Sequence, residues 1–222
     1  MTDDPARLAS VPTDMTGTEM ATYVAAKLCH DFVSPAGAIM SGLDLLNDPE
    51  AQDMRDDALG LITQSATKLI ALIHFCRVAF GAATTSERFT GEDLKGLVDG
   101  MIHGGRATMT WSVSETDLAK PAARALVNLA YLTVGALPTG GVATITSHRE
   151  GDSLVLTGLA EGARARLKAE AVTGLSGQRL SEGLAGQWVQ PYWLWLTASE
   201  AGGSLTTVVE EGRVALIARM PL

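Results

Sequence analysis

The sequence predicts an α+β fold: an N-terminal helical hairpin that dimerises into a four-helix bundle, followed by an α/β sandwich domain. Up to Phe80 the apolar residues recur at the three- and four-residue intervals of an amphipathic helix. Beyond residue 86, short runs of β type alternate with helical patterns, which is typical of helices mixed with a largely antiparallel sheet. Small and polar residues at 81–86 separate the two patterns. We therefore expect one domain at residues 1–82 and another at 83–222.

The composition excludes several classes of function. The 222 residues are 46% apolar and 19% charged, a normal balance for a globular protein. The net charge of −8 argues against binding to nucleic acid or to an anionic membrane surface. Charged residues interrupt the long apolar stretches, and residues 1–14 are acidic without an apolar core. We therefore expect a cytoplasmic protein with no membrane span and no secretion signal.

The first helix is expected to run from about residue 16 to residue 46. Thr16 and Glu19 have the spacing of a capping box, in which each side chain binds the other residue's backbone N–H. The Asn-Asp-Pro sequence at 47–49 ends the helix, because a residue before proline avoids helical dihedral angles. The apolar seam expected to pack against other helices consists of Ala25, Leu28, Phe32, Ala36, Ile39, Leu43 and Leu46.

The second helix is expected over residues 51–80, antiparallel to the first. Its seam is formed by Met54, Ala58, Leu61, Ser65, Leu69, Leu72, Cys76 and Ala79. Further apolar residues lie off this seam at Leu59, Ile62, Ile70 and Ile73. Because one hairpin cannot bury stripes this broad, we expect a homodimer. The two cysteines, Cys29 and Cys76, lie too far apart along the folded hairpin for a disulfide, so we expect two core thiols.

The remaining chain shows a regular order of short elements. Thr90 opens a short helix, and a closing β-hairpin ends the sequence. The expected strands are 106–113, 142–147, 154–159, 205–210 and 213–220, and the expected longer helices are 119–136 and 191–201. Helices combined with such strands predict the α+β sandwich.

One histidine faces away from the apolar seam of the first helix. His30 is two residues from both Leu28 and Phe32, so it lies on the opposite side of the helix. Asp31 follows it and can orient the imidazole or accept its proton, and a neutral imidazole is a nucleophile at neutral pH. We expect a partner protein to dock on this face, bordered by Lys27, Gly37 and Ser41 on the first helix and by Gln64 and Lys68 on the second.

The residues around His30 resemble a known motif. Residues 30–35 are His-Asp-Phe-Val-Ser-Pro, which is similar to the phospho-acceptor box His-Glu-Leu-Arg-Thr-Pro of histidine kinases. Proline inside a long helix costs about 3 kcal/mol, so Pro35 favours a specific motif over a chance match. The resemblance implies that His30 accepts a phosphoryl group, that Asp31 acts as the base and that Ser34 lies one turn further on.

The second half resembles the ATP-binding domain of histidine kinases, but its nucleotide-binding motifs are changed. Asn128 takes the first Asn position of that domain's Asn-bearing helix, whereas Leu132 stands where kinases place the Asn that holds Mg²⁺. Ala160 stands where the adenine-binding Asp belongs. Residues 185–193 replace the Gly-rich phosphate loop with a bulky aromatic segment. We therefore expect no working nucleotide site, no bound cofactor and no metal.

Together these features are similar to the ChpT-type histidine phosphotransferases of alphaproteobacteria. Residues 28–36, 41–46 and 52–57 carry the resemblance most closely. The family implies a cytoplasmic homodimer that takes a phosphoryl group from the receiver domain of a CckA-type hybrid histidine kinase. It then passes the group to response regulators of the CtrA and CpdR types. The Mg²⁺ for this chemistry would come from the receiver domain.

Three other functions stay open from the residues alone. An active histidine kinase would need the Mg²⁺ and adenine ligands that Leu132 and Ala160 replace. A module that only binds or sequesters regulators, in the manner of an anti-sigma factor, would not need His30. A phosphatase of receiver domains also fits, because Ser34 lies where histidine kinases place phosphatase residues. The residues do not decide which imidazole nitrogen is phosphorylated or in which direction the phosphoryl group flows.

Overall fold

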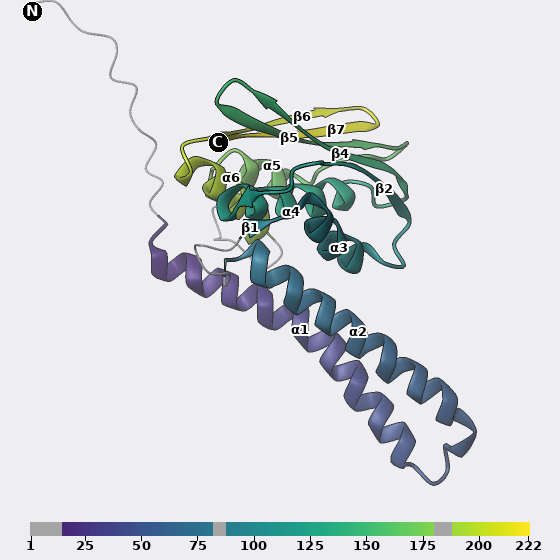
Figure 1. Ribbon diagram of the computed structural model, residues 1–222. Helices are drawn as coiled ribbons and strands as arrows, with labels where there is room; N and C mark the ends of the chain where they lie inside the picture. The colour runs from purple at the N-terminus through teal and green to yellow at the C-terminus, as the bar shows by residue number, and fades with distance from the viewer. Residues whose placement is uncertain (1–14, 82–87, 180–187) are drawn as a thin grey trace, which may run out of the picture.

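The computed structural model describes residues 15–81, 88–179 and 188–222. A long helical hairpin projects from a sandwich made of a sheet and a layer of helices (Figure 1). Helices α3, α4 and α6, whose bounds are given below, lie between the sheet and the hairpin. The α+β fold class expected from the sequence is confirmed. The expected domain boundary at residue 82 falls in the segment 82–87, which lies outside the described residues.

The hairpin consists of α1 (Gly17–Asn47), a short 3-10 turn η1 (Gln52–Met54) and α2 (Arg55–Ala79). The predicted capping box opens α1. The backbone N–H of Glu19 donates to Oγ1 of Thr16 at 3.2 Å, and the N–H of Thr16 donates to the Glu19 carboxylate at 3.0 Å. Asp48 follows α1 with extended backbone angles, as the Asn-Asp-Pro sequence predicts. Both predicted helices are therefore confirmed.

The face of α1 that packs on α2 is not the predicted seam. Ala25, Ala36 and Leu43 of that seam are exposed. The buried residues of α1 are instead Met20, Lys27, Pro35 and Gly42. Leu28 and Phe32 of the predicted seam are partly buried and pack against the core, so the prediction is confirmed only in part.

Small residues decide how closely the two helices approach. A Cβ atom at Gly42 would lie 2.6 Å from the Ile62 side chain and 3.1 Å from the backbone oxygen of Ala58. Only glycine fits there without moving a neighbour.

The predicted seam of α2 is largely confirmed, since Ala58, Ser65, Leu72, Cys76 and Ala79 are buried. Met54, at its start, is 43% exposed. Both cysteines are free thiols, but only one of them is buried. The core prediction is therefore right for Cys76 and wrong for Cys29, which lies on the outward face of α1.

The sandwich contains a five-stranded sheet in the order β2-β4-β5-β7-β6. The pair β2–β4 is parallel and the other pairs are antiparallel. The strands are β2 (Ala107–Ser112), β4 (Gly141–Glu150), β5 (Ser153–Glu161), β6 (Ser204–Glu210) and β7 (Arg213–Pro221). A separate antiparallel pair joins β1 (Arg88–Phe89) to β3 (Leu118–Ala119). The helices are α3 (Gly91–Ile102), α4 (Lys120–Gly135), α5 (Ala169–Leu175) and α6 (Val189–Glu200).

Each element that the sequence predicts in this half is present, and three short ones were missed. Helix α5 has 7 residues, and β1 and β3 have 2 residues each. Segments this short show too few periods for an apolar pattern to emerge from the sequence. They are defined only by their tertiary partners.

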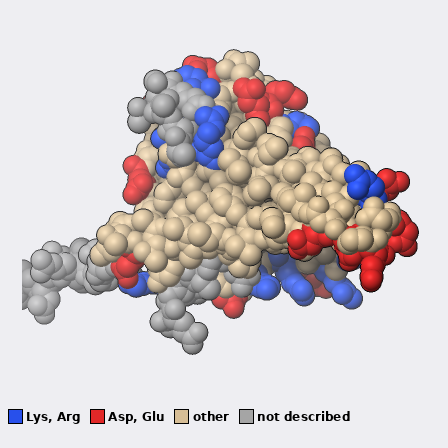
Figure 2. Space-filling view, turned by 90° about the horizontal axis from the view of Figure 1, so that it is seen from below, with Lys and Arg blue, Asp and Glu red and all other residues tan. Residues whose placement is uncertain are grey.

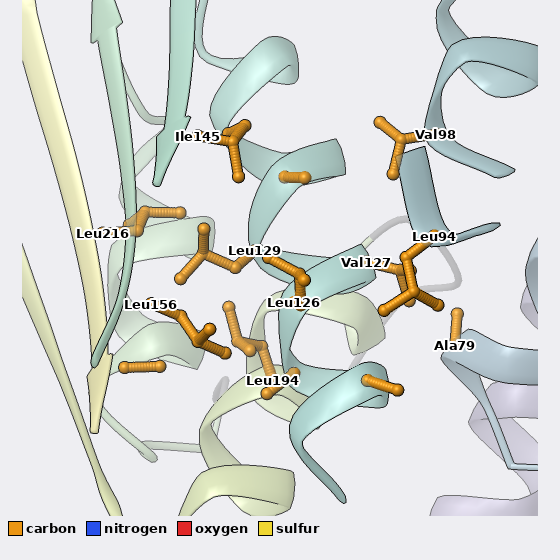
Figure 3. Close-up of a cluster of buried hydrophobic side chains, with 14 of the residues drawn as sticks. Ala79, Leu94, Val98, Leu126, Val127, Leu129, Ile145, Leu156, Leu194 and Leu216 are labelled. Carbon is orange, nitrogen blue, oxygen red and sulfur yellow. The ribbon is translucent and has the colours of Figure 1, made fainter. Parts of the chain in front are cut away.

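Helix α4 is the centre of the core. Figure 3 shows Leu129 pointing toward Leu156 and Leu216 of the sheet, while Val127 points toward Leu94 of α3 and the end of α2. All of these side chains are fully buried. One core therefore joins the sheet, the helical layer and the base of the hairpin.

The end of α2 is tied to α4 and α6 by hydrogen bonds that converge on one carbonyl group. The backbone oxygen of Ala79 accepts from Nδ2 of Asn128 at 2.9 Å and from Nε1 of Trp193 at 2.7 Å. Oδ1 of Asn128 accepts from Nε2 of Gln190 at 3.0 Å, and both amide side chains are buried. The guanidinium of Arg124 lies 5.4 Å from the centre of the Trp193 ring. These contacts fix the hairpin relative to the sandwich.

A second contact holds α6 against the start of α1. Met20 of α1 forms a buried cluster with Val189 and Tyr192 of α6. The rings of Tyr192 and Trp195 lie 5.4 Å apart beside it. The aromatic segment predicted at 185–193 is thus used, from Trp188 onward, to anchor the hairpin; residues 185–187 lie outside the described residues.

Helix α2 is more apolar than the sequence analysis, which predicts no membrane span, assumed. Residues 52–79 are long and apolar enough, by length and composition only, to cross a membrane. In the fold this segment packs against α1, α3 and α4, and its last turns carry buried Phe75, Val78 and Ala79. Its apolar residues therefore serve in part to pack the hairpin against the sandwich.

Replacing Asn128 by alanine tests the junction. We expect Asn128→Ala to lower the free energy of unfolding by about 2–3 kcal/mol, because Gln190 loses its acceptor inside the core. Urea denaturation measures the change. Asn47→Ala, at the exposed end of α1, is the control and should shift stability by less than about 0.5 kcal/mol. Equal stability of the two variants would contradict the role of the junction.

Candidate functional site

His30 is presented to solvent from the middle of α1. Its side chain is 80% exposed, and its Nδ1 atom lies 3.1 Å from Oδ1 of Asp31. The other carboxylate oxygen of Asp31 accepts a hydrogen bond from Nζ of Lys27 at 2.7 Å. Lys27 precedes Asp31 by one helical turn, so the pair has the favourable i, i+4 spacing. The three side chains form one continuous polar chain along α1.

The contact between His30 and Asp31 selects a tautomer. An ionised carboxylate can only accept hydrogen bonds, so Nδ1 must carry a proton to make this contact. In a neutral imidazole the lone pair is then on Nε2. The geometry therefore favours Nε2 of His30 as the free nucleophilic atom.

A small cavity of about 280 Å³ lies beside His30. The hairpin and the sandwich both line it, since Lys68 and Leu72 come from α2, Met101 from α3 and Tyr131 from α4. Burial raises the pKa of Tyr131, whose ring lies 5.3 Å from that of Phe75. The sandwich domain therefore contributes directly to the surroundings of His30.

A larger groove of about 910 Å³ continues from this cavity between the hairpin and α3. It shares Ser34, Lys68, Gly100 and Met101 with the small cavity. A Cβ atom at Gly100 would lie 3.1 Å from Cβ of Ala71, so α3 crosses α2 closely at this point. The groove also carries Gln64 and Thr67 from α2 and Asp99 and His103 from α3.

The structure places the predicted docking residues in different surroundings. Ser34, Gln64 and Lys68 line the cavity or the groove beside His30. Gly37 and Ser41 are exposed on α1 but line neither space.

Lys27 was wrongly assigned to the docking surface. It is buried and its ammonium is paired with Asp31, so it does not present its charge on the surface.

Sequence reasoning missed the residues that the sandwich supplies. Gly100, Met101 and Tyr131 lie near His30 only because α3 and α4 pack on α2. No spacing in the sequence links positions 30, 100 and 131. Leu72 of α2, which was not among the predicted site residues, also lines the cavity beside His30.

The positions that resemble a nucleotide site have other roles in this fold. Asn128 has no exposed surface, and its side-chain amide forms hydrogen bonds with Ala79 and Gln190 at the junction. Ala160 is fully buried in β5. Leu132 is partly buried and packs against the core. Within 15–81, 88–179 and 188–222, no group of three or more His, Cys, Asp or Glu side chains is placed to hold a metal ion.

An exposed histidine supported by an aspartate on a helical hairpin, next to an α/β sandwich, defines a protein of the histidine phosphotransfer class. Residues 91–213 match the family model described as the histidine phosphotransferase C-terminal domain. The chain is 30% identical over 198 residues to the protein phosphotransferase ChpT of Brucella abortus (strain 2308), covering 87% of this chain and 91% of that protein. The chain therefore belongs to the ChpT-type histidine phosphotransferase family, as its sequence predicts.

A solved structure agrees with this assignment. A bacterial phosphotransferase superposes with a TM-score of 0.81 and 26% sequence identity, covering 92% of this chain and 97% of that one. The protein is thus a phosphotransferase that acts in a phosphorelay by histidine phosphotransfer.

The buried thiol of this site gives a direct chemical test. Burial raises the pKa of Cys76 to about 12 from an ordinary value of 9.0, so the folded thiol stays neutral at pH 9. In the Cys29→Ser variant we expect Cys76 to resist a thiol reagent at pH 9 until urea unfolds the chain. Because the unfolded thiol ionises first, the contribution of Cys76 to stability is complete below pH 9 and is lost as the pH rises toward 12. Rapid labelling of the native variant would contradict the burial.

Proposed function

We propose that His30 is the residue that accepts and donates the phosphoryl group. The observation that carries this proposal is the exposed imidazole with its Nδ1 atom against Asp31 and its Nε2 atom free. The matched family range, residues 91–213, does not include His30, so the assignment depends on this geometry and on the phospho-acceptor motif at 30–35.

The proposed reaction is phosphoryl exchange between a receiver aspartate and His30. The Nε2 lone pair attacks phosphorus in line with the P–O bond of the aspartyl phosphate. The N–P bond forms as the P–O bond breaks, and the aspartate leaves as a carboxylate with the bonding electrons. The Nδ1 proton stays on the ring beside Asp31, which stabilises the positive charge of the phosphorylated imidazole. Transfer to a second receiver runs the same steps in reverse.

The receiver domain is proposed to dock over the cavity and the groove beside His30. These spaces adjoin the nucleophile and combine apolar surface from Met101 and Leu72 with the polar groups of Ser34 and Lys68. The partners we propose are a CckA-type hybrid kinase as donor and CtrA-type and CpdR-type regulators as acceptors. The receiver would bring the Mg²⁺ that offsets the phosphate charge. Such partners place the protein in the cytoplasm.

We propose that the protein works as a homodimer. Figure 2 shows that the middle of the hairpin face turned away from the sheet is free of charged side chains, whereas acidic side chains gather at one end of it. Large apolar side chains are exposed along the hairpin at Val33, Met40, Leu43, Met54, Leu59, Ile70 and Ile73. A continuous apolar stripe on two helices is buried when two hairpins form a four-helix bundle. This surface also accounts for the exposed part of the predicted α1 seam.

The protein is proposed to act without ATP. Leu132, which stands where the resembling kinases place the Asn that holds Mg²⁺, packs against the core and offers no ligand atom. The amide of Asn128 is buried and engaged in the junction, so it is not available to a nucleotide or its metal. This argues against the alternative of an active histidine kinase.

Phosphotransfer from a labelled receiver domain separates these functions. We expect the wild-type chain to acquire an acid-labile, base-stable label from a phosphorylated receiver but none from ATP alone. His30→Ala should abolish the label. His148→Ala should keep it, because His148 is exposed on β4 and lines neither the cavity nor the groove.

Label on His30→Ala would refute the role of this residue. No label on the wild type would instead favour a regulator-binding module. Loss of receiver phosphate without label on the chain would favour a phosphatase that uses Ser34.

A charge placed in the apolar stripe tests the dimer. Ile70 is 55% exposed, and we expect Ile70→Glu to convert a dimer into a monomer at micromolar concentration, because burying an unpaired carboxylate in the bundle is costly. Analytical ultracentrifugation measures the mass. Val208→Glu, on the sheet and 41% exposed, is the matched control that should remain dimeric. A wild-type chain that sediments only as a monomer would contradict the proposal.

A further inference from the structure

Lys27 is an unusual partner for a surface histidine because it is buried. Its side chain is only 9% exposed, while that of Asp31 is 23% exposed and that of His30 is 80% exposed. The carboxylate of Asp31 thus receives a cation from the interior side and the imidazole from the solvent side. A lysine is rarely buried to this extent without a role for its charge.

The first consequence of the pair concerns orientation. Each oxygen of Asp31 has one partner, Oδ2 with Nζ of Lys27 at 2.7 Å and Oδ1 with Nδ1 of His30 at 3.1 Å. An Asp31 side chain held only by His30 could rotate into the solvent. The bond to Lys27 removes that freedom and keeps Oδ1 at the imidazole.

The second consequence concerns charge. A carboxylate beside an imidazole favours the protonated ring, and an imidazolium has no lone pair for attack on phosphorus. The ammonium of Lys27, 2.7 Å from Oδ2 of Asp31, offsets the charge of the carboxylate that orients the ring.

The other ionisable groups around the site come from three helices. Lys68 of α2 and Tyr131 of α4 line the cavity beside His30, and Asp99 and His103 of α3 line the adjoining groove. Cys76 of α2 lies near Lys27. None of these groups changes in the variants below, so a difference in pH dependence reports on the Lys27–Asp31 pair.

We propose that Lys27 is a positioning residue that holds Asp31 against Nδ1 of His30 and cancels its charge. Nε2 of the imidazole is then left free to attack. This role rests on the proposed function of His30 and deepens it, since it states how a fully exposed histidine is kept ready for phosphotransfer.

The test compares pH profiles of phosphotransfer from a phosphorylated receiver domain to the full-length chain. In Lys27→Met the charge of Asp31 is no longer offset, so we expect the profile to move to higher pH by about one unit and the rate at pH 7 to fall about tenfold. Asp31→Asn leaves Lys27 unopposed, so its profile should move to lower pH. Opposite shifts in the two variants are not produced by a merely structural pair.

Nitrogen-15 NMR of His30 provides a readout that does not depend on activity. The wild-type ring should carry its proton on Nδ1, and Lys27→Met should increase the population with the proton on Nε2. Lys27→Gln keeps a hydrogen-bond donor without the charge, so it should keep the wild-type tautomer and still shift the pH profile. Lys95→Met removes the lysine of another i, i+4 pair, with Asp99 on α3, and should leave the His30 tautomer unchanged.

Unchanged pH profiles and an unchanged tautomer in Lys27→Met and Lys27→Gln would overturn the role of Lys27. The role of His30 would survive that result, because it is tested by the loss of label in His30→Ala. If Lys27→Met fails to fold, Lys27→Gln and Asp31→Asn decide the question by the direction of their shifts.

Discussion

The arrangement of this protein depends on the backbone carbonyl group of Ala79. That group belongs to the last residue of α2 and accepts hydrogen bonds from Asn128 of α4 and Trp193 of α6. Because Asn128 is also held by Gln190, the end of the hairpin is anchored to two helices of the sandwich at once. Together with the buried core that α2 shares with α3 and α4, this anchor holds α3 and α4 beside the hairpin. The cavity that joins Met101 and Tyr131 to His30 is therefore a consequence of the junction.

The same junction explains how a fold that resembles a nucleotide-binding domain uses its helices for attachment to the hairpin. The helix that carries Asn in the resembling kinases is retained as α4, but its amide faces the core and not a ligand. The aromatic residues of α6 pack against the hairpin, with Trp193 on the Ala79 carbonyl and Tyr192 on Met20. In this fold these side chains attach the hairpin to the sandwich.

The phosphotransfer site combines opposite requirements in three residues. A nucleophile that meets another protein must be exposed, as His30 is, whereas the groups that orient it must be held still. Burial of Lys27 satisfies the second requirement because its ammonium has one partner, Asp31, within the hairpin. Solvent exposure thus falls stepwise from the reacting atom to the supporting cation. Such a gradient keeps the reactive ring accessible while its support is shielded from competing water.

The sequence by itself determined the order of the secondary-structure elements, the capping box at Thr16, the phospho-acceptor motif at His30 and the family. These features depend on neighbouring residues or on one helical period, so local pattern is sufficient. Tertiary structure decided which face of α1 meets α2, where small residues such as Gly42 override apolar size. It also decided that Lys27 is buried and that Tyr131 lies beside His30. Those relations arise from the packing of segments far apart in the chain, and side-chain volume and hydrogen-bond geometry in three dimensions set them.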